Sequence, residues 1–129
     1  MYKVLVSDYI SDAGLNILKK NVEVYFNHKL SREELLNIIG DFDGIIVRSF
    51  TQLDKEALGK AENLKVIGRA RTGYDNIDIE EASKKGIIVF NTPTGNTISA
   101  AEHTMAMILS LSRNEPQANN ALHKGIWNR

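Results

Sequence analysis

Two arginines and a group of hydroxyl and amide side chains stand where the predicted strands of this sequence end. An arginine guanidinium can bind a carboxylate or a phosphate through two parallel hydrogen bonds. The strand-end residues are Asp8, Tyr9, Arg48, Ser49, Arg69, Asn91, Thr92, Pro93, Gly95, Asn96 and Thr97, together with the loop 70–76. Because ligands of open α/β sheets bind beyond the carboxyl ends of the strands, this pattern predicts a site for a small anion. In the alternative interpretation, Arg48 and Arg69 only pair with acids such as Asp8 or Asp75.

A regular alternation of strands and helices must position these residues. The sequence predicts five short apolar strands, at residues 3–8, 22–26, 44–49, 64–69 and 87–91. A helix follows each strand: Ser11 caps the first, Ser31 and Glu34 form a capping box at the second, and residues 54–61 and 77–85 form the next two. Strands that are apolar on both faces, with helices that are apolar on one, are typical of a doubly wound parallel sheet. We therefore predict an α/β fold, a flavodoxin-like five-stranded parallel sheet in the order 2-1-3-4-5 with helices on both faces.

The fifth helix is the longest and ends the predicted domain. Thr97 or Ser99 is its predicted N-cap, and Ser99 with Glu102 forms a predicted capping box. We predict a flavodoxin-like domain at residues 1–114 and a polar tail at residues 115–129.

This helix also carries apolar side chains on more than one face, namely Met105, Met107, Ile108 and Leu111. A helix that is apolar on several sides needs more than one packing partner. We therefore expect a homodimer that forms through residues 98–129, with packing or exchange of the helix between two copies.

The composition excludes several classes of function. The 16 basic and 16 acidic residues balance, which gives no support for a nucleic-acid partner or an anionic membrane surface. The sequence has no cysteine, no signal peptide before its first strand, and no apolar run near the roughly 20 residues of a membrane span. Its histidines lack metal-ligand spacing, so we expect no metal site. We expect no membrane partner and a cytoplasmic location.

Six segments of the sequence resemble those of the D-2-hydroxyacid dehydrogenases, in the order and spacing of that family. The segments are residues 47–51, 64–70, 72–78, 86–91, 95–102 and 125–129. The resemblance implies a flavodoxin-like substrate domain beside a separate domain that binds NAD. Arg48, Ser49 and Arg69 match family positions that contact the substrate. Thr72 and Gly73 match the backbone turn that holds its carboxylate.

Other elements of that family have no counterpart in this sequence. Asn96 and Thr97 match the start of the helix that leads into the nucleotide domain, but no Gly-x-Gly-x-x-Gly fingerprint follows them. The family's catalytic arginine, acid and histidine also lie in that domain. We therefore expect no catalytic and no cofactor-binding residue in this chain, with NAD bound only by the parent enzyme. The expected partner is a small anionic substrate, a phosphorylated hydroxy acid that this chain alone binds weakly or not at all.

One residue departs from the family pattern inside the loop that should hold the carboxylate. Arg71 stands where the pattern Gly-Arg-Ala-Gly-x-Gly has a glycine. Glycine permits a positive φ, which would cost arginine on the order of 1 kcal/mol. Three consequences are open: the loop changes shape, the Arg71 side chain fills the anion site, or it supplies an additional cation.

These observations favour one function and leave one alternative. We expect the substrate-binding part of an NAD-dependent 2-hydroxyacid dehydrogenase, inactive by itself. The alternative is a non-catalytic folded scaffold or an engineered self-associating domain. A phospho-receiver domain is excluded because Ser49 stands where an acid is needed, and a flavin carrier because Asp8 and Asp12 would repel its phosphate. We expect Asp8 to make strand-end hydrogen bonds, and Glu102 to cap a helix, rather than act in proton transfer.

Overall fold

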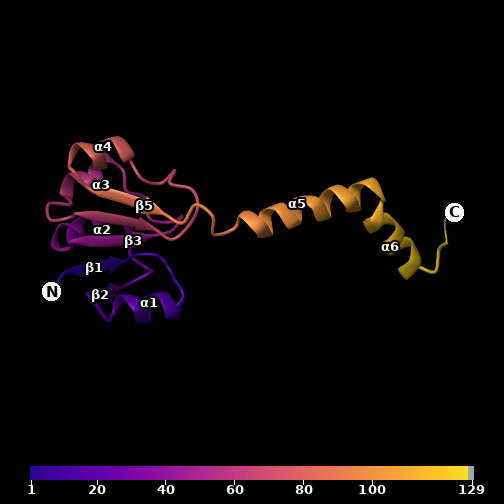
Figure 1. Cartoon of the computed structure of the whole chain (residues 1–129), viewed down its shortest axis with the longest axis horizontal. Helices are drawn as coiled ribbons and strands as arrows, with labels where there is room; N and C mark the ends of the chain where they lie inside the picture. Colours follow the sequence, from indigo (N-terminus) through magenta and orange to yellow (C-terminus); the bar gives the residue numbers. More distant parts are fainter. Residues whose placement is uncertain (128–129) are drawn as a thin grey trace. The chain divides into compact units, whose positions relative to one another are not determined.

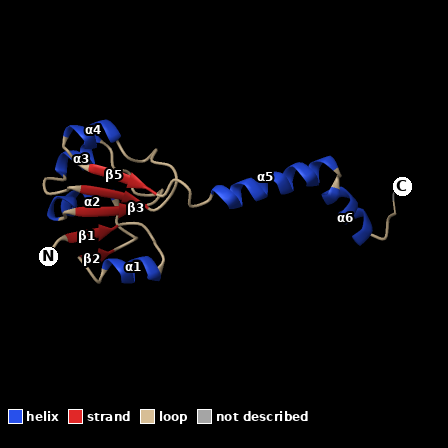
Figure 2. Ribbon diagram, viewed as in Figure 1, coloured by secondary structure: helices blue, strands red, loops and turns tan. Residues whose placement is uncertain are grey.

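The computed structural model describes residues 1–127, and its central element is a five-stranded parallel sheet (Figure 1). The strands are β1 (Lys3–Val6), β2 (Glu23–Phe26), β3 (Gly44–Val47), β4 (Val66–Arg69) and β5 (Ile88–Asn91). They lie side by side in the order β2-β1-β3-β4-β5, which confirms the predicted flavodoxin-like topology (Figure 2). The central strands are short aliphatic runs, as expected of strands with helices on both sides.

Helices follow the strands as predicted, and most begin at a side-chain cap. They are α1 (Asp12–Leu18), α2 (Arg32–Ile38), α3 (Lys55–Lys60), α4 (Ile79–Lys84), α5 (Thr97–Ser112) and α6 (Glu115–His123), with a short 3-10 turn η1 (Ile39–Asp41) after α2. The capping box of Ser31 and Glu34 is confirmed, and Ser11 caps α1. Asp54 and Asp78 cap α3 and α4. Within residues 1–127, no helix is long and apolar enough to cross a membrane.

Two boundary predictions are wrong. Neither Thr97 nor Ser99 caps α5, because the helix begins at Thr97 and Asn96 holds the N-cap position without a side-chain cap bond. Ser99 instead donates its hydroxyl to the Asn96 carbonyl at 3.1 Å, so it forms no capping box with Glu102. Strand β3 ends before residue 48 because the N–H of Arg48 donates to the Asp8 side chain, not to a neighbouring strand.

The chain divides into two compact units, Met1–Gly95 and Asn96–Arg129. The first contains the sheet and α1 to α4, and the second contains α5 and α6. The segment that was expected to be a polar tail is largely helical, since α6 covers Glu115–His123. The assignment of residues 1–114 and 115–129 to separate roles stays a prediction.

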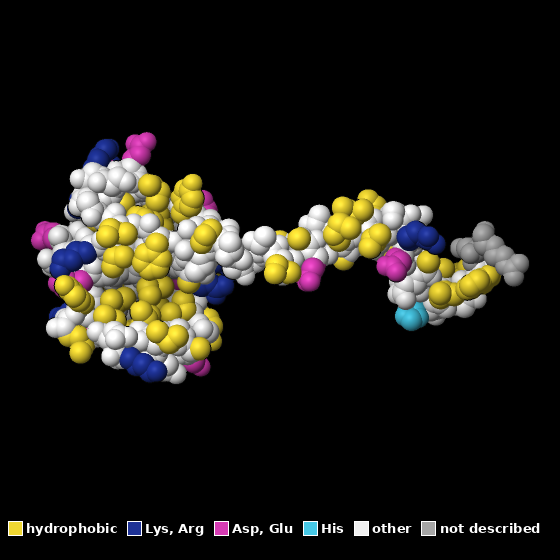
Figure 3. All heavy atoms as spheres, viewed as in Figure 1, with side chains coloured by type: hydrophobic (Ala, Val, Ile, Leu, Met, Phe, Trp, Pro, Cys, Tyr) yellow, Lys and Arg dark blue, Asp and Glu magenta, His cyan; other side chains and the backbone are white. Residues whose placement is uncertain are grey.

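The two faces of the sheet are covered unequally. On one face, Leu5, Ile45 and Ile67 are almost completely buried in a core shared with α2, α3 and α4. On the other face, the short helix α1 lies next to β2, whereas β5 exposes 66% of Ile88 and 55% of Phe90. Figure 3 shows hydrophobic atoms gathered on this side of the first unit. The uncovered part of the sheet leads directly to the strand ends where the anion site was predicted.

Candidate functional site

Arg69, the last residue of β4, is a buried cation with defined partners. Its side chain is 5% exposed, and its Nη2 lies 3.0 Å from Oδ1 of Asp75, a carboxylate that is 86% exposed. Its Nε donates to the carbonyl oxygen of Arg48 at 3.1 Å. The alternative interpretation is therefore correct for Arg69 and Asp75, which do form an ion pair. The ion pair ties the end of β4 to the loop that follows it, and the bond to the Arg48 carbonyl ties β4 to the loop after β3.

Arg48, the first residue after β3, is held differently. Its side chain is half-buried and donates from Nη1 to the carbonyl oxygen of Tyr9 at 3.2 Å. No carboxylate of the described residues lies within ion-pair distance of the Arg48 guanidinium. The alternative pairing of the Arg48 side chain with Asp8 does not form. The Arg48 guanidinium therefore lies at the strand ends without a carboxylate bonded to it among the described residues.

Asp8 bonds the loop after β3 through that loop's backbone. Its Oδ2 accepts the N–H of Arg48 and, at 3.3 Å each, those of Phe50 and Thr51. Its Oδ1 accepts the Thr51 hydroxyl at 2.8 Å. The side chain is buried, so these bonds compensate the loss of its hydration. The expectation of a strand-end hydrogen-bonding role for Asp8 is confirmed.

Gly73 lies against the Arg69 guanidinium. A Cβ at Gly73 would stand 2.7 Å from Nη1 of Arg69 and 3.0 Å from Oδ1 of Asp75, so the ends of both side chains would have to shift to admit it. Glycine lets the loop backbone approach the guanidinium without moving that buried side chain. The carbonyl of the preceding Thr72 accepts a hydrogen bond from Nδ2 of Asn91, the last residue of β5. The predicted turn is thus packed against β4 and bonded to β5.

Arg71 adopts an ordinary backbone conformation. Asn114 is the one non-glycine residue with a positive φ in the part of the chain that the structure describes, so Arg71 carries no strain of that kind. Its N–H donates to the Arg69 carbonyl at 2.8 Å, and its carbonyl accepts the N–H of Thr92 at 3.1 Å. Its side chain is exposed. The loop accommodates arginine at this position without a left-handed residue.

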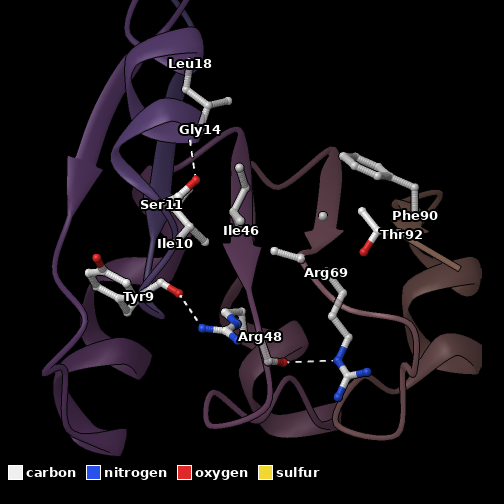
Figure 4. Close-up of a pocket in the computed structure, with 12 residues that line it drawn as sticks. Tyr9, Ile10, Ser11, Gly14, Leu18, Ile46, Arg48, Arg69, Phe90 and Thr92 are labelled. Atoms are coloured by element: carbon white, nitrogen blue, oxygen red, sulfur yellow. Dashed lines mark hydrogen bonds between the residues drawn. The ribbon is translucent and has the colours of Figure 1, made fainter. Parts of the chain in front are cut away.

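A cavity of about 600 Å³ opens between α1 and the uncovered part of the sheet. Its walls include Leu18 of α1, Ile46 of β3 and Phe90 of β5. In Figure 4, Arg48 and Arg69 lie at one end of this cavity, and the Arg48 guanidinium is directed toward Tyr9. A mostly apolar cavity with cationic groups at one end can accept a small anion at that end.

Within the first unit, the structure brings three of the predicted site residues together. Arg48, Arg69 and Gly73 meet at the strand ends. Ser49 lies in the loop after β3 and Thr72 in the loop after β4, and both residues are exposed. The remaining two predicted residues, at positions 96 and 97, belong to the second unit, which is described separately.

Sequence reasoning missed Asn76. This buried residue donates from Nδ2 to the carbonyls of Arg48 at 2.8 Å and Thr51 at 2.6 Å. The signal in the sequence was weak, because Asn76 is one polar residue in a loop full of polar residues. Only its burial distinguishes it from its neighbours.

A metal ion and a dinucleotide each require particular donor groups among the described residues. Among residues 1–127, no three His, Cys, Asp or Glu side chains are grouped to hold a metal ion. A dinucleotide pyrophosphate needs glycines in the turn between the first strand and helix. Here that turn is Ser7-Asp8-Tyr9-Ile10-Ser11, with a buried carboxylate in place of a glycine. The turn therefore does not fit NAD.

Comparison with known proteins places the chain in a family. The model of the D-isomer specific 2-hydroxyacid dehydrogenase catalytic domain matches residues 4–126. The D-3-phosphoglycerate dehydrogenase of Archaeoglobus fulgidus is 46% identical over 128 residues, which are 98% of this chain and 24% of that protein. The D-3-phosphoglycerate dehydrogenase of Bacillus subtilis is 47% identical over a match that includes 100% of this chain and 24% of the Bacillus protein. The chain thus spans about a quarter of the length of these curated relatives.

Solved structures agree with this assignment. A crystal structure of a Pyrococcus horikoshii protein matches with a TM-score of 0.88 and 40% identity, covering 100% of this chain and 39% of that one. The NAD⁺-bound 3-phosphoglycerate dehydrogenase of Entamoeba histolytica matches with a TM-score of 0.70 and 32% identity, covering 84% of this chain and 38% of that one. The sheet order, the arginines at its strand ends and these matches lead to one conclusion: the chain belongs to the family of D-isomer specific 2-hydroxyacid dehydrogenases.

Proposed function

We propose that this chain is the substrate-binding part of an NAD-dependent D-3-phosphoglycerate dehydrogenase, the enzyme that oxidises 3-phosphoglycerate at the entry to serine synthesis. The observation that carries the proposal is Arg48, a half-buried cation at the mouth of a cavity with no carboxylate partner among the described residues. The identities of 46% and 47% to two D-3-phosphoglycerate dehydrogenases support the choice of substrate.

In this proposal the two arginines have different roles. Arg48 binds an anionic group of the substrate through its guanidinium, because that group has no carboxylate bonded to it among the described residues and is half-buried at the cavity. Arg69 is buried and paired with Asp75, so it holds the loop of Thr72 and Gly73 in place beside the substrate carboxylate. We retain Ser49, Asn96 and Thr97 as further proposed contacts.

The chain positions the substrate, and the chemistry of the whole enzyme requires groups that it does not supply. Oxidation moves a hydride from the substrate to NAD while a base takes the hydroxyl proton. No residue of this chain is proposed for either task, so we expect no turnover from the chain alone. Sustained NADH consumption with 3-phosphohydroxypyruvate, in a preparation free of host enzyme, would contradict this expectation.

The direct test is an NMR titration of the isotopically labelled chain with 3-phosphoglycerate. We expect chemical-shift changes in residues 48–51 and 69–76. Arg48→Ala should raise the dissociation constant about 10- to 100-fold, which corresponds to the loss of one hydrogen bond between charged groups. Arg71→Gly, which removes an exposed guanidinium two residues from Arg69, is the matched control. A titration without shifts in the wild-type chain would overturn the proposal.

We also propose that two copies associate through residues 98–129, of which 128–129 lie outside the described residues. No residue of α5 is buried, and the apolar side chains of Met105, Ile108 and Leu109 are more than half exposed. Such apolar side chains favour contact with a second copy of the helix. Sedimentation equilibrium should give a mass that rises with concentration, and Leu111→Asp should lower it. A monomeric mass at every concentration would exclude this association, and with it the self-associating scaffold.

A further inference from the structure

Buried side chains hold both peptide groups that flank the Cα of Arg48. The N–H of Arg48, in the peptide group before it, donates to the Asp8 carboxylate. The carbonyl of Arg48, in the peptide group after it, accepts Nδ2 of Asn76 at 2.8 Å and Nε of Arg69 at 3.1 Å. Asp8 and Asn76 are each 4% exposed. Hydrogen bonds inside a protein are stronger electrostatically than bonds in water, so these two peptide groups have little freedom to rotate. Together they fix the direction in which the Arg48 side chain leaves the backbone.

Asn76 connects the loop after β4 to the loop after β3. An amide nitrogen carries two hydrogens, and those of Asn76 go to the carbonyls of Arg48 and Thr51. Its Oδ1 is buried and has no hydrogen-bond partner among the described residues. Burying such an acceptor is unfavourable, so the two donated bonds are what this side chain contributes here. Both bonds act on the loop that carries Arg48.

Asp8 occupies the other side of the same loop. Its carboxylate accepts the backbone N–H groups of Arg48, Phe50 and Thr51 and the Thr51 hydroxyl. Three backbone donors of this loop are therefore taken by an internal anion. The guanidinium of Arg48 is the cationic group that this loop offers to an anion in the cavity.

We propose that Asp8 and Asn76 are positioning residues for Arg48: they set the affinity of the site for the substrate anion through the Arg48 guanidinium and do not touch the anion. The inference rests on the proposed function of Arg48 as an anion-binding residue. Asp8 holds the peptide group before the Arg48 Cα, and Asn76 holds the peptide group after it. Loss of either bond releases one of these groups and lets the guanidinium leave its position.

The first test is a double-mutant cycle read by the dissociation constant of 3-phosphoglycerate in NMR titrations. We expect Asn76→Ala to weaken binding about tenfold in the wild-type background and less than about twofold in an Arg48→Ala background, because its effect passes through Arg48. An equal loss in both backgrounds would overturn the proposal, since a general loosening of the fold acts whether or not Arg48 is present.

A milder pair of variants keeps the test valid if Asn76→Ala folds poorly. Thr51→Val removes the hydroxyl that donates to Asp8, whereas Thr51→Ser keeps it. We expect Thr51→Val to weaken binding several-fold and Thr51→Ser to bind as the wild type does. Equal affinities for the two variants would count against the role of Asp8.

A measurement without ligand separates this inference from the proposed function. The ¹⁵Nε relaxation of arginine side chains should show a loss of order at Arg48 in Asn76→Ala and no change at the exposed Arg71. If the wild-type chain binds no 3-phosphoglycerate, the proposed function fails, and this measurement still decides the positioning role. Unchanged order at Arg48 would overturn the inference by itself.

Discussion

The two compact units of this chain bury very different amounts of apolar surface. Every buried hydrophobic side chain of the described residues lies between Leu5 and Ile87, in the first unit. The second unit consists of α5 and α6, in which no residue is buried. Isolated helices of 16 and 9 residues are marginally stable in water without tertiary packing. The first unit therefore holds its own structure, whereas the second needs a partner surface.

This difference extends to the proposed site. Arg69, Gly73 and Asn76 are fixed by packing and by hydrogen bonds within the first unit. Asn96 and Thr97 stand at the beginning of the second unit. We infer that the proposed binding of the anion depends mostly on the unit that has a core, and that the residues of α5 contribute only when that helix is held by a partner.

The largest predicted effect compares one isoleucine from each unit. Ile67 in β4 is completely buried, and Ile67→Ala should lower the free energy of unfolding by about 3 kcal/mol, through lost burial and a cavity. Ile108→Ala in α5 should change it by less than about 0.5 kcal/mol in dilute solution, since Ile108 is 54% exposed. Urea unfolding measures both. Similar losses for the two variants would break the comparison.

A smaller effect tests the close packing at the site. Gly73→Ala should cost about 1–3 kcal/mol of unfolding free energy and weaken binding of 3-phosphoglycerate, because the new methyl group displaces Arg69 or Asp75. Gly59→Ala is the matched control, since no atom lies within 4 Å of its added Cβ. That variant should be stabilised by about 0.4–1 kcal/mol, because alanine favours the helix. If Gly73→Ala left both the unfolding free energy and the binding of 3-phosphoglycerate unchanged, the loop would not be tightly packed.

Asp54 should contribute to the loss of folding stability at acidic pH. Its pKa is lowered, first because the Arg32 guanidinium donates to it and second because it accepts the N–H of Ala57. A carboxyl group whose pKa is lowered in the folded state stabilises that state. The full contribution is present when the pH is above the ordinary pKa of 3.8, and it is lost as the pH falls through the lowered pKa.

Asp54→Asn should therefore flatten the acid dependence of the melting temperature, and Arg32→Gln should do the same by removing the partner. The effect should stay below about 1 kcal/mol because both side chains are more than a third exposed. Thermal melts between pH 2 and 7 measure it. An acid dependence identical to the wild type in both variants would rule out this ion pair as a contributor.

The smallest effect is expected from removing the second unit. A chain that ends at Gly95 should keep its unfolding free energy within about 0.5 kcal/mol, because no described residue after Gly95 is buried. It should also lose the proposed self-association and any contact that Asn96 and Thr97 make to the anion. Urea unfolding, sedimentation equilibrium and a 3-phosphoglycerate titration measure these three effects. A large loss of stability would contradict the independence of the first unit.

Much of the first unit could be predicted from local patterns. Alternating strands and amphipathic helices led to the sheet order, and Ser31 with Glu34 led to a correct helix start, because both signals depend on near neighbours in the sequence. The ends of β1 and β3 could not be predicted, since Asp8 and Arg48 bond each other across 40 positions. The N-terminus of α5 was misplaced because Ser99 and Glu102 match a capping box that the helix does not use.

The sequence by itself determined the fold class and the family, because hydrophobic periodicity and motif spacing can be read without coordinates. It also pointed to the edge of the sheet where we propose that an anion binds. It offered two arginines of equal chemistry at that edge. The tertiary structure distinguished them: Arg69 is buried and paired with Asp75, whereas Arg48 is half-buried and has no carboxylate partner among the described residues. Burial and pairing depend on residues distant in sequence, and they decide which charge a ligand can reach.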